Sequence, residues 1–190
     1  MRILLSILLA LPLSLAAKAP LAPGDNAVAW AASKRMMFSH SDPVGVNKAA
    51  TAELSATAKD AYVVKVLIPI DKFDSGTPSR DKEVVKALGG EAQPVMVFES
   101  TTLTAKDLAA LRATGGILAG TLTLNNKAHP IQFTVTADGK TVAGEAQLKM
   151  SALEVKAPSF VGGLVMKVAD EVGLYFQYDV AAIKGQDAIK

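Results

Sequence analysis

The side chains that could perform chemistry in this sequence are few. His40 and His129 are the only histidines, and there is no cysteine. A transition-metal site needs several nitrogen, sulfur or carboxylate ligands at close spacing, and neither histidine has an acidic cluster beside it. His129 directly precedes Pro130 in a predicted hairpin, so we expect both histidines to be solvated loop residues. We therefore predict no metal site and no cofactor.

Nucleophilic catalysis has no strong candidate either. Ser75 is followed by Gly76, but the sequence contains no Gly-x-Ser-x-Gly turn of the kind that exposes a catalytic serine. The absence of cysteine excludes thiol catalysis and a cysteine-linked lipid anchor. We expect no catalytic residues and predict that the protein is not an enzyme. An esterase-like or isoprenoid-processing activity that depends on Ser75 or His129 is kept as an alternative.

The pair Arg80-Asp81 is the polar feature that most suggests recognition. An arginine at the opening of a pocket can bind a pyrophosphate or quinone oxygen through its planar guanidinium group. Asp81 also falls in the first turn of a predicted helix, where a carboxylate interacts favourably with the helix dipole. The pair is therefore either a headgroup contact at the mouth of a cavity or an ion pair at the start of a helix.

The elements that must position these residues are mostly strands. Apolar and polar residues alternate through much of the second half of the chain, which is the pattern of β-strands with one buried face. The predicted inward positions are Leu122, Leu124, Ile131, Phe133, Val135, Ala146, Leu148, Met150, Leu174, Phe176, Tyr178 and Val180. Between the last four, Tyr175, Gln177 and Asp179 are predicted to face solvent.

Further strands are expected nearer the N-terminus, and tight turns separate the later ones. Residues 62–70 form a long apolar strand pattern, and weaker patterns cover residues 30–38 and 50–56. The predicted turns are Asn125-Asn126, Asp138-Gly139 and Gly162-Gly163. Their short spacing favours an antiparallel meander.

Two short helices are predicted from their end signals. Thr77-Pro78 provides a cap and a first-turn proline for a helix over residues 80–88, which Gly89-Gly90 ends. Thr104 stands three residues before Asp107, the spacing of a capping box, and predicts a second helix over residues 104–113.

Composition limits the fold and the partners. With 190 residues, half of them apolar, the chain can bury one sizeable core, and we expect one domain. Met1-Arg2 and the apolar run that follows predict a signal peptide over residues 1–17, with an alternative end at residue 19. Removal of this peptide would take away Arg2 and reduce the 20 basic residues to 19, against 18 acidic ones. Such a balance gives no reason to expect a nucleic-acid partner.

Three segments follow one another in a characteristic order. A polar stretch with Gly76 and Arg80-Asp81 precedes Pro94, the strand 98–100 and a hairpin. The matching residues from that strand and hairpin are Phe98, Glu99, Ser100, Gly120, Leu122, Thr123, Leu124 and Pro130. In this order the sequence resembles the YceI-like family of periplasmic, lipocalin-like proteins that hold polyisoprenoid lipids in a β-barrel. The resemblance is good over roughly the last two-thirds of the predicted mature chain and loose before it.

Two positions depart from the family pattern. Asn126 stands where the hairpin usually has glycine, and asparagine tolerates a left-handed backbone nearly as well. Residues 151–154 replace a later segment that carries an arginine, so no role of that arginine is carried over. The implied fold is mainly β, an antiparallel up-and-down lipocalin-like β-barrel of about eight strands with one or two short helices. It would occupy residues 18–190.

Alternation alone does not decide whether side chains fill the barrel or leave a lumen. The residues favour a filled core slightly, and the resemblance favours a lumen. The predicted lumen residues are Trp30, Phe38, Tyr62, Val64, Val66, Phe98, Leu122, Leu124, Phe133, Leu148, Met150, Phe176 and Tyr178. An uncharged wall of this kind attracts a hydrocarbon chain, with about 0.8 kcal/mol for each buried methylene.

The resemblance therefore implies a periplasmic carrier whose partner is a long-chain isoprenoid lipid of quinone or polyprenyl type. The predicted signal peptide is consistent with the periplasm, and secretion is the alternative location. No stable membrane anchor is expected, and a homodimer stays open. The alternative function is an exported stress-response or interaction module with a filled barrel and no lipid ligand.

Overall fold

The fold is known from a computed structural model that describes residues 20–22, 24–36, 39–156 and 167–188. The strands in these residues are β1 (Ala27–Met36), β2 (Ser39–Ser41), β3 (Val44–Asn47), β4 (Thr51–Ala58), β5 (Ala61–Pro69), β6 (Val95–Ser100), β7 (Gly116–Leu124), β8 (Lys127–Ala137), β9 (Thr141–Lys149) and β10 (Lys167–Asp179). The α-helices are α1 (Pro78–Ala87) and α2 (Ala105–Thr114). Short 3-10 helices span Ile70–Lys72, Met150–Leu153, Val180–Ala182 and Gln186–Ala188.

All the described strands belong to one antiparallel sheet. Its order is β2-β1-β10-β9-β8-β7-β6-β5-β4, and β3 pairs with β1. Most neighbours in space are also neighbours in sequence, as in an up-and-down meander. The structure confirms the predicted mainly β, lipocalin-like fold with two short helices, although the described residues form ten strands rather than about eight.

The sheet curls around a single interior. Val28 on β1 and Ala52 on β4 come from opposite ends of the strand order, yet both belong to the same cluster of buried apolar residues. The C-terminal segment helps to hold the β4 edge. The Lys184 N–H donates to Ala52 O at 3.0 Å, and the Leu54 N–H donates to Lys184 O at 2.8 Å. Strand β4 therefore has a partner on each side.

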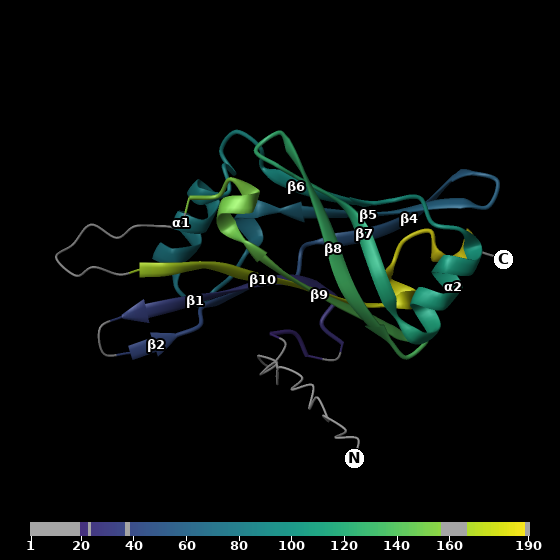
Figure 1. Cartoon of the computed structure of the whole chain (residues 1–190), viewed down its shortest axis with the longest axis horizontal. Coiled ribbons are helices and arrows are strands. Elements are labelled where there is room, and N and C mark those ends of the chain that lie inside the picture. Colours follow the sequence, from purple (N-terminus) through teal and green to yellow (C-terminus); the bar gives the residue numbers. More distant parts are fainter. Residues whose placement is uncertain (1–19, 23, 37–38, 157–166, 189–190) are drawn as a thin grey trace, which may run out of the picture.

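Helices α1 and α2 lie at opposite ends of the sheet (Figure 1). Thr77 and Pro78 begin α1, as predicted, although the Thr77 side chain makes no capping hydrogen bond. Helix α2 begins with the predicted capping box, in which Thr104 and Asp107 each satisfy the other's backbone N–H. Both helix predictions are confirmed within one or two residues at each end.

The predicted Asn125-Asn126 turn is confirmed between β7 and β8. Both residues have left-handed backbones, with φ values of 51° and 57°. Two successive left-handed residues define the type I′ turn that matches the twist of a hairpin. Asparagine at position 126 therefore supports the left-handed backbone that this turn requires.

The outer face of β10 differs from the prediction. Tyr175 and Gln177 are 6% and 8% exposed, so the prediction that they face solvent is wrong. Tyr175 packs in a second cluster with Leu21, Ala27 and Ala29. The side chain of Gln177 donates to the carbonyl of Ala22. The segment before β1 thus covers part of this strand, which an alternation pattern cannot reveal.

Three predicted strand ends are 3-10 helices instead. Ile70, Met150 and Val180 each begin a 3-10 helix, yet all three side chains are buried as expected. The predicted strand over residues 50–56 is confirmed as β4, and Trp30 lies in β1. The predicted signal peptide and the Gly162-Gly163 turn lie outside the described residues.

Candidate ligand-binding cavity

An apolar cavity of about 310 Å³ occupies the interior of the curled sheet. Its wall combines the inner faces of the strands with residues of both α-helices. The charged residues of the wall are Arg80 and Glu83 on α1 and Arg112 on α2. Figure 1 shows the two helices at opposite ends of the sheet, so these charged residues come from elements at opposite ends of the molecule. The strand residues between them are almost entirely apolar.

Aromatic rings that lie over glycines help to keep the interior open. A Cβ atom at Gly45 would lie 2.3 Å from Trp30 Nε1, and one at Gly144 would lie 2.3 Å from a ring carbon of Phe176. A Cβ at Gly120 would similarly meet the Phe98 ring at 2.6 Å. Each ring therefore fills the space beside a glycine on a neighbouring strand rather than the centre of the barrel.

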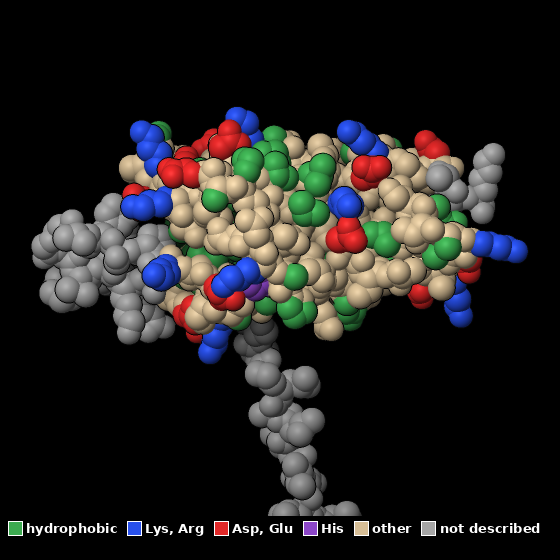
Figure 2. Space-filling view, turned by 90° about the horizontal axis from the view of Figure 1, so that it is seen from above, with side chains coloured by type: hydrophobic (Ala, Val, Ile, Leu, Met, Phe, Trp, Pro, Cys, Tyr) green, Lys and Arg blue, Asp and Glu red, His purple; other side chains and the backbone are tan. Residues whose placement is uncertain are grey.

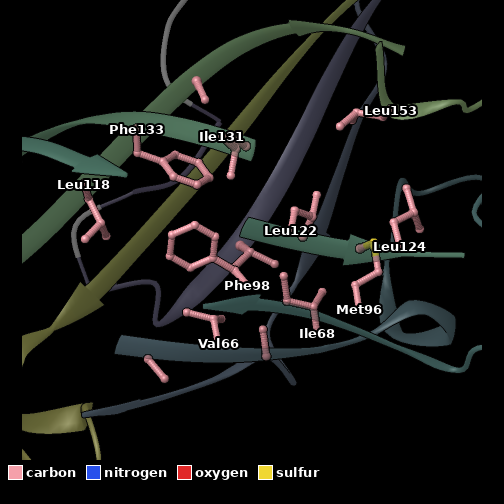
Figure 3. Close-up of a cluster of buried hydrophobic side chains, with 14 of the residues drawn as sticks. Val66, Ile68, Met96, Phe98, Leu118, Leu122, Leu124, Ile131, Phe133 and Leu153 are labelled. Carbon is pink, nitrogen blue, oxygen red and sulfur yellow. The ribbon is translucent and has the colours of Figure 1, made fainter. Parts of the chain in front are cut away.

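Three phenylalanines form a continuous band along the inner face of the sheet. Phe98 and Phe133 pack edge to face with ring centroids 5.4 Å apart, and Phe133 and Phe176 do the same at 5.2 Å. Figure 3 shows the Phe98 and Phe133 rings pointing toward each other from β6 and β8. Edge-to-face contacts stabilise aromatic pairs beyond their burial alone, so the band both supports the fold and lines the cavity.

The structure brings most of the predicted lumen residues together on the wall. These are Trp30, Val64, Val66, Phe98, Leu122, Leu124, Phe133, Met150, Phe176 and Tyr178. Tyr62 and Leu148 are not part of the wall. Leu148 does pack against the buried core, from the face of β9 that also carries Ala146. Phe38 lies outside the described residues. A direct role of these residues in binding stays a prediction.

The side chains of Arg80 and Asp81 make different contacts in the structure. Arg80 borders the cavity and donates from Nη1 to Ser75 O at 3.3 Å. Asp81 is not on the wall, and its Oδ1 accepts hydrogen bonds from Ser75 N at 3.0 Å and Ser75 Oγ at 2.6 Å. Within the described residues the two do not form an ion pair. Asp81 thus fastens the loop to α1, and only Arg80 is placed to meet a ligand.

Both α-helices contribute residues to the wall that we did not predict. Val84 and Leu88 on or just after α1, and Leu108 and Leu111 on α2, border the cavity. Their spacings of four and three residues place each pair on one face of its helix. That spacing was a readable signal, but it does not by itself say which face of the sheet the helix covers.

His129 is buried, so the prediction of a solvated loop residue is wrong. It lies on the inner face of β8 and is 7% exposed, because the strand begins at Lys127, before His129. Its Nε2 has no hydrogen-bond partner among the described residues, and it is not on the cavity wall. His40 lies in β2. No group of acidic residues and histidines suited to a metal ion occurs in the described part of the chain.

The outer surface is of mixed charge. Figure 2 shows basic and acidic side chains interspersed over one face, with small separate apolar areas between them. Lys65 Nζ on β5 and Glu99 Oε2 on the neighbouring strand β6 form an exposed ion pair at 2.9 Å. Across residues 20–22, 24–36, 39–156 and 167–188, no helix has the length and apolar character needed to cross a membrane.

An antiparallel barrel that encloses an apolar cavity defines the lipocalin-like class of fold. The sequence profile described as the YceI-like domain matches residues 21–180, and the chain belongs to this family. No curated protein matches the sequence.

Several solved structures share the fold, among them two from different organisms. One is BcnA of Burkholderia cenocepacia, at 22% identity and a TM-score of 0.53, with 79% of this chain and 94% of that chain covered. The other is a polyisoprenoid binding domain from Saccharophagus degradans implicated in plant cell wall breakdown. It has 12% identity and a TM-score of 0.52, with 80% of this chain and 93% of that chain covered.

Proposed function

We propose that this protein is an exported, periplasmic carrier that holds a long-chain isoprenoid lipid in its cavity and catalyses no reaction. The observation that carries the proposal is the apolar cavity of about 310 Å³ inside the barrel. Membership of the YceI-like family supports it, as does the polyisoprenoid binding domain among the solved structures of this fold.

The free energy for such binding comes from burial of hydrocarbon. At about 0.8 kcal/mol for each methylene, a five-carbon isoprene unit supplies about 3 to 4 kcal/mol as an upper bound. A few units offset the cost of ordering a flexible chain. An apolar wall without charges between its two ends favours such a chain over a sugar, a nucleotide or a peptide.

The direct test is extraction of the purified protein with organic solvent, followed by mass spectrometry. We expect an isoprenoid lipid to co-purify, and the emptied protein to bind the neutral apolar probe N-phenylnaphthylamine. A blocking variant, Leu122→Trp, places a larger ring on the wall, whereas the control Thr123→Trp changes a side chain on the opposite face of β7. Loss of probe binding in the first variant alone supports the proposal. Absence of both a lipid and probe binding in the wild type contradicts it.

Export is tested separately. Expression of the full chain in a Gram-negative host, followed by cell fractionation and mass measurement, should recover a protein in the periplasm that begins near residue 18. Recovery of the uncleaved chain in the cytoplasm would contradict the location while leaving lipid binding open to the first test.

A further inference from the structure

Helix α2 contributes to the cavity wall, yet it is largely exposed. Neither α-helix has a buried residue, but seven of the ten residues of α2 are exposed, against four of the ten in α1. Leu108 and Leu111 are partly buried, border the cavity and pack against the apolar core. The packing of α2 on the barrel therefore depends largely on two side chains that border the cavity.

Hydrogen bonds to other elements hold α2 only at its ends. Ala105 N donates to Asp60 Oδ1 at 2.9 Å, and Gly139 N donates to Arg112 O at 3.1 Å. Arg112 also donates from Nε to Gly139 O at 3.4 Å. Among the described residues, 106–111 form hydrogen bonds only within the helix and its cap. The middle of α2 is thus joined to the barrel by packing alone.

The C-terminal segment contributes to the wall at the same end of the barrel and is fastened more firmly (Figure 1). It meets the turn between β8 and β9, as α2 does, because Val180 N donates to Lys140 O at 2.7 Å. Val180 is buried, and backbone hydrogen bonds join Lys184 to β4. Of these two elements, α2 has fewer contacts to lose, so it opens at the lower cost in free energy.

Helix α1, at the other end, packs closely on the core. A Cβ atom at Gly90, just after this helix, would lie 2.9 Å from Val85 Cγ1 and 3.0 Å from Ile70 Cγ2. Ile70 is fully buried. The last turn of α1 is therefore fixed against a residue of the core, whereas the middle of α2 rests on the cavity.

A helix of ten residues has little stability of its own. Isolated helices shorter than about 12 residues are marginal in water, so α2 depends on the packing of its apolar face. A ligand in the cavity supplies partners for Leu108 and Leu111, which an empty cavity lacks. Ten residues span about 15 Å as a helix but reach about 33 Å when extended. Unwinding therefore provides slack even while both ends stay attached.

We propose that α2 is the gate of the barrel: its middle unwinds to let the lipid chain enter or leave, and it refolds over the bound chain. This inference rests on the proposed function and specifies the route of its ligand. The ligand stabilises the closed helix through Leu108 and Leu111, and the closed helix retains the ligand. The two effects are equal in free energy, because such coupling is reciprocal.

The experiment weakens each helix without changing the wall. Ala110→Gly lowers the helix propensity of α2 at an exposed site, and Thr104→Ala removes the side chain of its cap. Neither residue borders the cavity. Lys82→Gly is the matched change at an exposed site of α1 that is also off the wall. Stopped-flow fluorescence measures the rates at which N-phenylnaphthylamine binds to and leaves the delipidated full-length protein.

We expect each α2 variant to raise the association rate and the release rate by the same factor of about five, the effect of one such substitution on helix stability. The dissociation constant should stay unchanged, because entry and exit use the same opening. Lys82→Gly should alter neither rate. In the wild type, amide hydrogen exchange should be faster in α2 than in α1, and the bound probe should slow it in α2.

Unchanged rates in both α2 variants would overturn the gate while the proposed function stands. An equal or larger increase in Lys82→Gly would also overturn it, because the opening would not be specific to α2. A change confined to the release rate would reduce α2 to a part of the binding wall. Exchange in α2 as slow as in α1 would exclude local unwinding. If the folded wild type binds no probe, the proposed function fails as well. Circular dichroism checks the fold of every variant, and either α2 variant alone suffices for the test.

Discussion

Tyr175 and Tyr178 lie three residues apart on β10 and are similarly buried, at 6% and 4% exposed. Their hydroxyls nevertheless differ in hydrogen bonding. Both residues border the cavity, but the Tyr175 side chain packs in the outer cluster, and its Oη accepts a hydrogen bond from Gln147 Nε2 at 3.1 Å. Among the residues that the structure describes, Tyr178 Oη has no such partner. Burial alone therefore does not leave a hydroxyl unpaired. The outer face of β10 satisfies the Tyr175 hydroxyl from within the protein, whereas the buried Tyr178 hydroxyl on the inner face has no hydrogen-bond partner among the described residues.

The largest expected effect comes from truncation on the inner face. Phe176→Ala removes an edge-to-face contact with Phe133 and should lower the free energy of unfolding by about 3 kcal/mol, the low end for such changes because one side already faces a cavity. It should also weaken probe binding. Leu21→Ala on the outer side should destabilise by at least about 2 kcal/mol without affecting the probe. Urea unfolding and probe titration measure both, and equal effects on the probe would remove the distinction between the faces.

Overpacking provides a second contrast of about 1 to 3 kcal/mol on each face. Gly144→Val would place a side chain against the Phe176 ring and drive that ring toward the cavity, so stability and probe binding should both fall. Gly173→Val would crowd the Tyr175 ring instead, so only stability should fall. Thermal unfolding with and without the probe separates the two results. Retained probe binding in the Gly144 variant would show that the Phe176 ring does not set the cavity's shape.

The two hydroxyls give a smaller and more specific contrast. Tyr175→Phe leaves Gln147 without its partner and should destabilise the delipidated protein by about 0.5 to 1.5 kcal/mol. Tyr178→Phe removes a hydroxyl that has no hydrogen-bond partner in the described part of the chain, so it should leave the delipidated protein equally stable or more stable. Urea midpoints of the two variants test this directly. Clear destabilisation by Tyr178→Phe would mean that the hydroxyl is bonded within the protein.

The smallest expected effect is a loss of stability at alkaline pH. The free energy of unfolding should be unaffected by ionisation of Tyr178 at neutral pH and should fall above about pH 10. Burial raises the folded-state pKa of Tyr178 above its ordinary value of 10.0. The unfolded chain therefore releases this proton first, so the stabilising contribution is complete below that value and is lost as the pH rises past it. Urea midpoints at about pH 9 and about pH 11 should fall further for the wild type than for Tyr178→Phe. Parallel declines would contradict the burial of an unionised hydroxyl.

Local patterns were sufficient to predict much of the fold. Two-residue alternation located the later strands, and the Asn125-Asn126 turn and the Thr104 capping box fixed a hairpin and a helix start. Each of these features is determined by residues that are close together in sequence, so a short segment is enough to predict it. The cavity itself could not be predicted from the alternation, because a filled barrel and a hollow one have the same pattern.

The errors have two physical origins. Alternation indicates that one face of a strand is apolar, but it does not show what covers the other face. Gln177 is buried because the segment at Ala22 packs against it, and the two lie far apart in sequence. Leu111 shows the same limit for a helix, which was predicted without its partner face. The error at His129 is one of strand limits, because the residue was predicted to lie in a solvated loop, whereas β8 begins at Lys127 and places it on the inner face.

The rings that lie over glycines restrict how the internal volume can change in evolution. Enlargement at Gly45, Gly120 or Gly144 collides with the ring beside it, and loss of that ring exposes a bare patch of backbone. Neither single change is neutral, so each ring and its glycine should vary together among homologues. Adaptation to a bulkier or slimmer ligand would then require paired substitutions on adjacent strands. We therefore expect the volume of the cavity to change slowly in evolution.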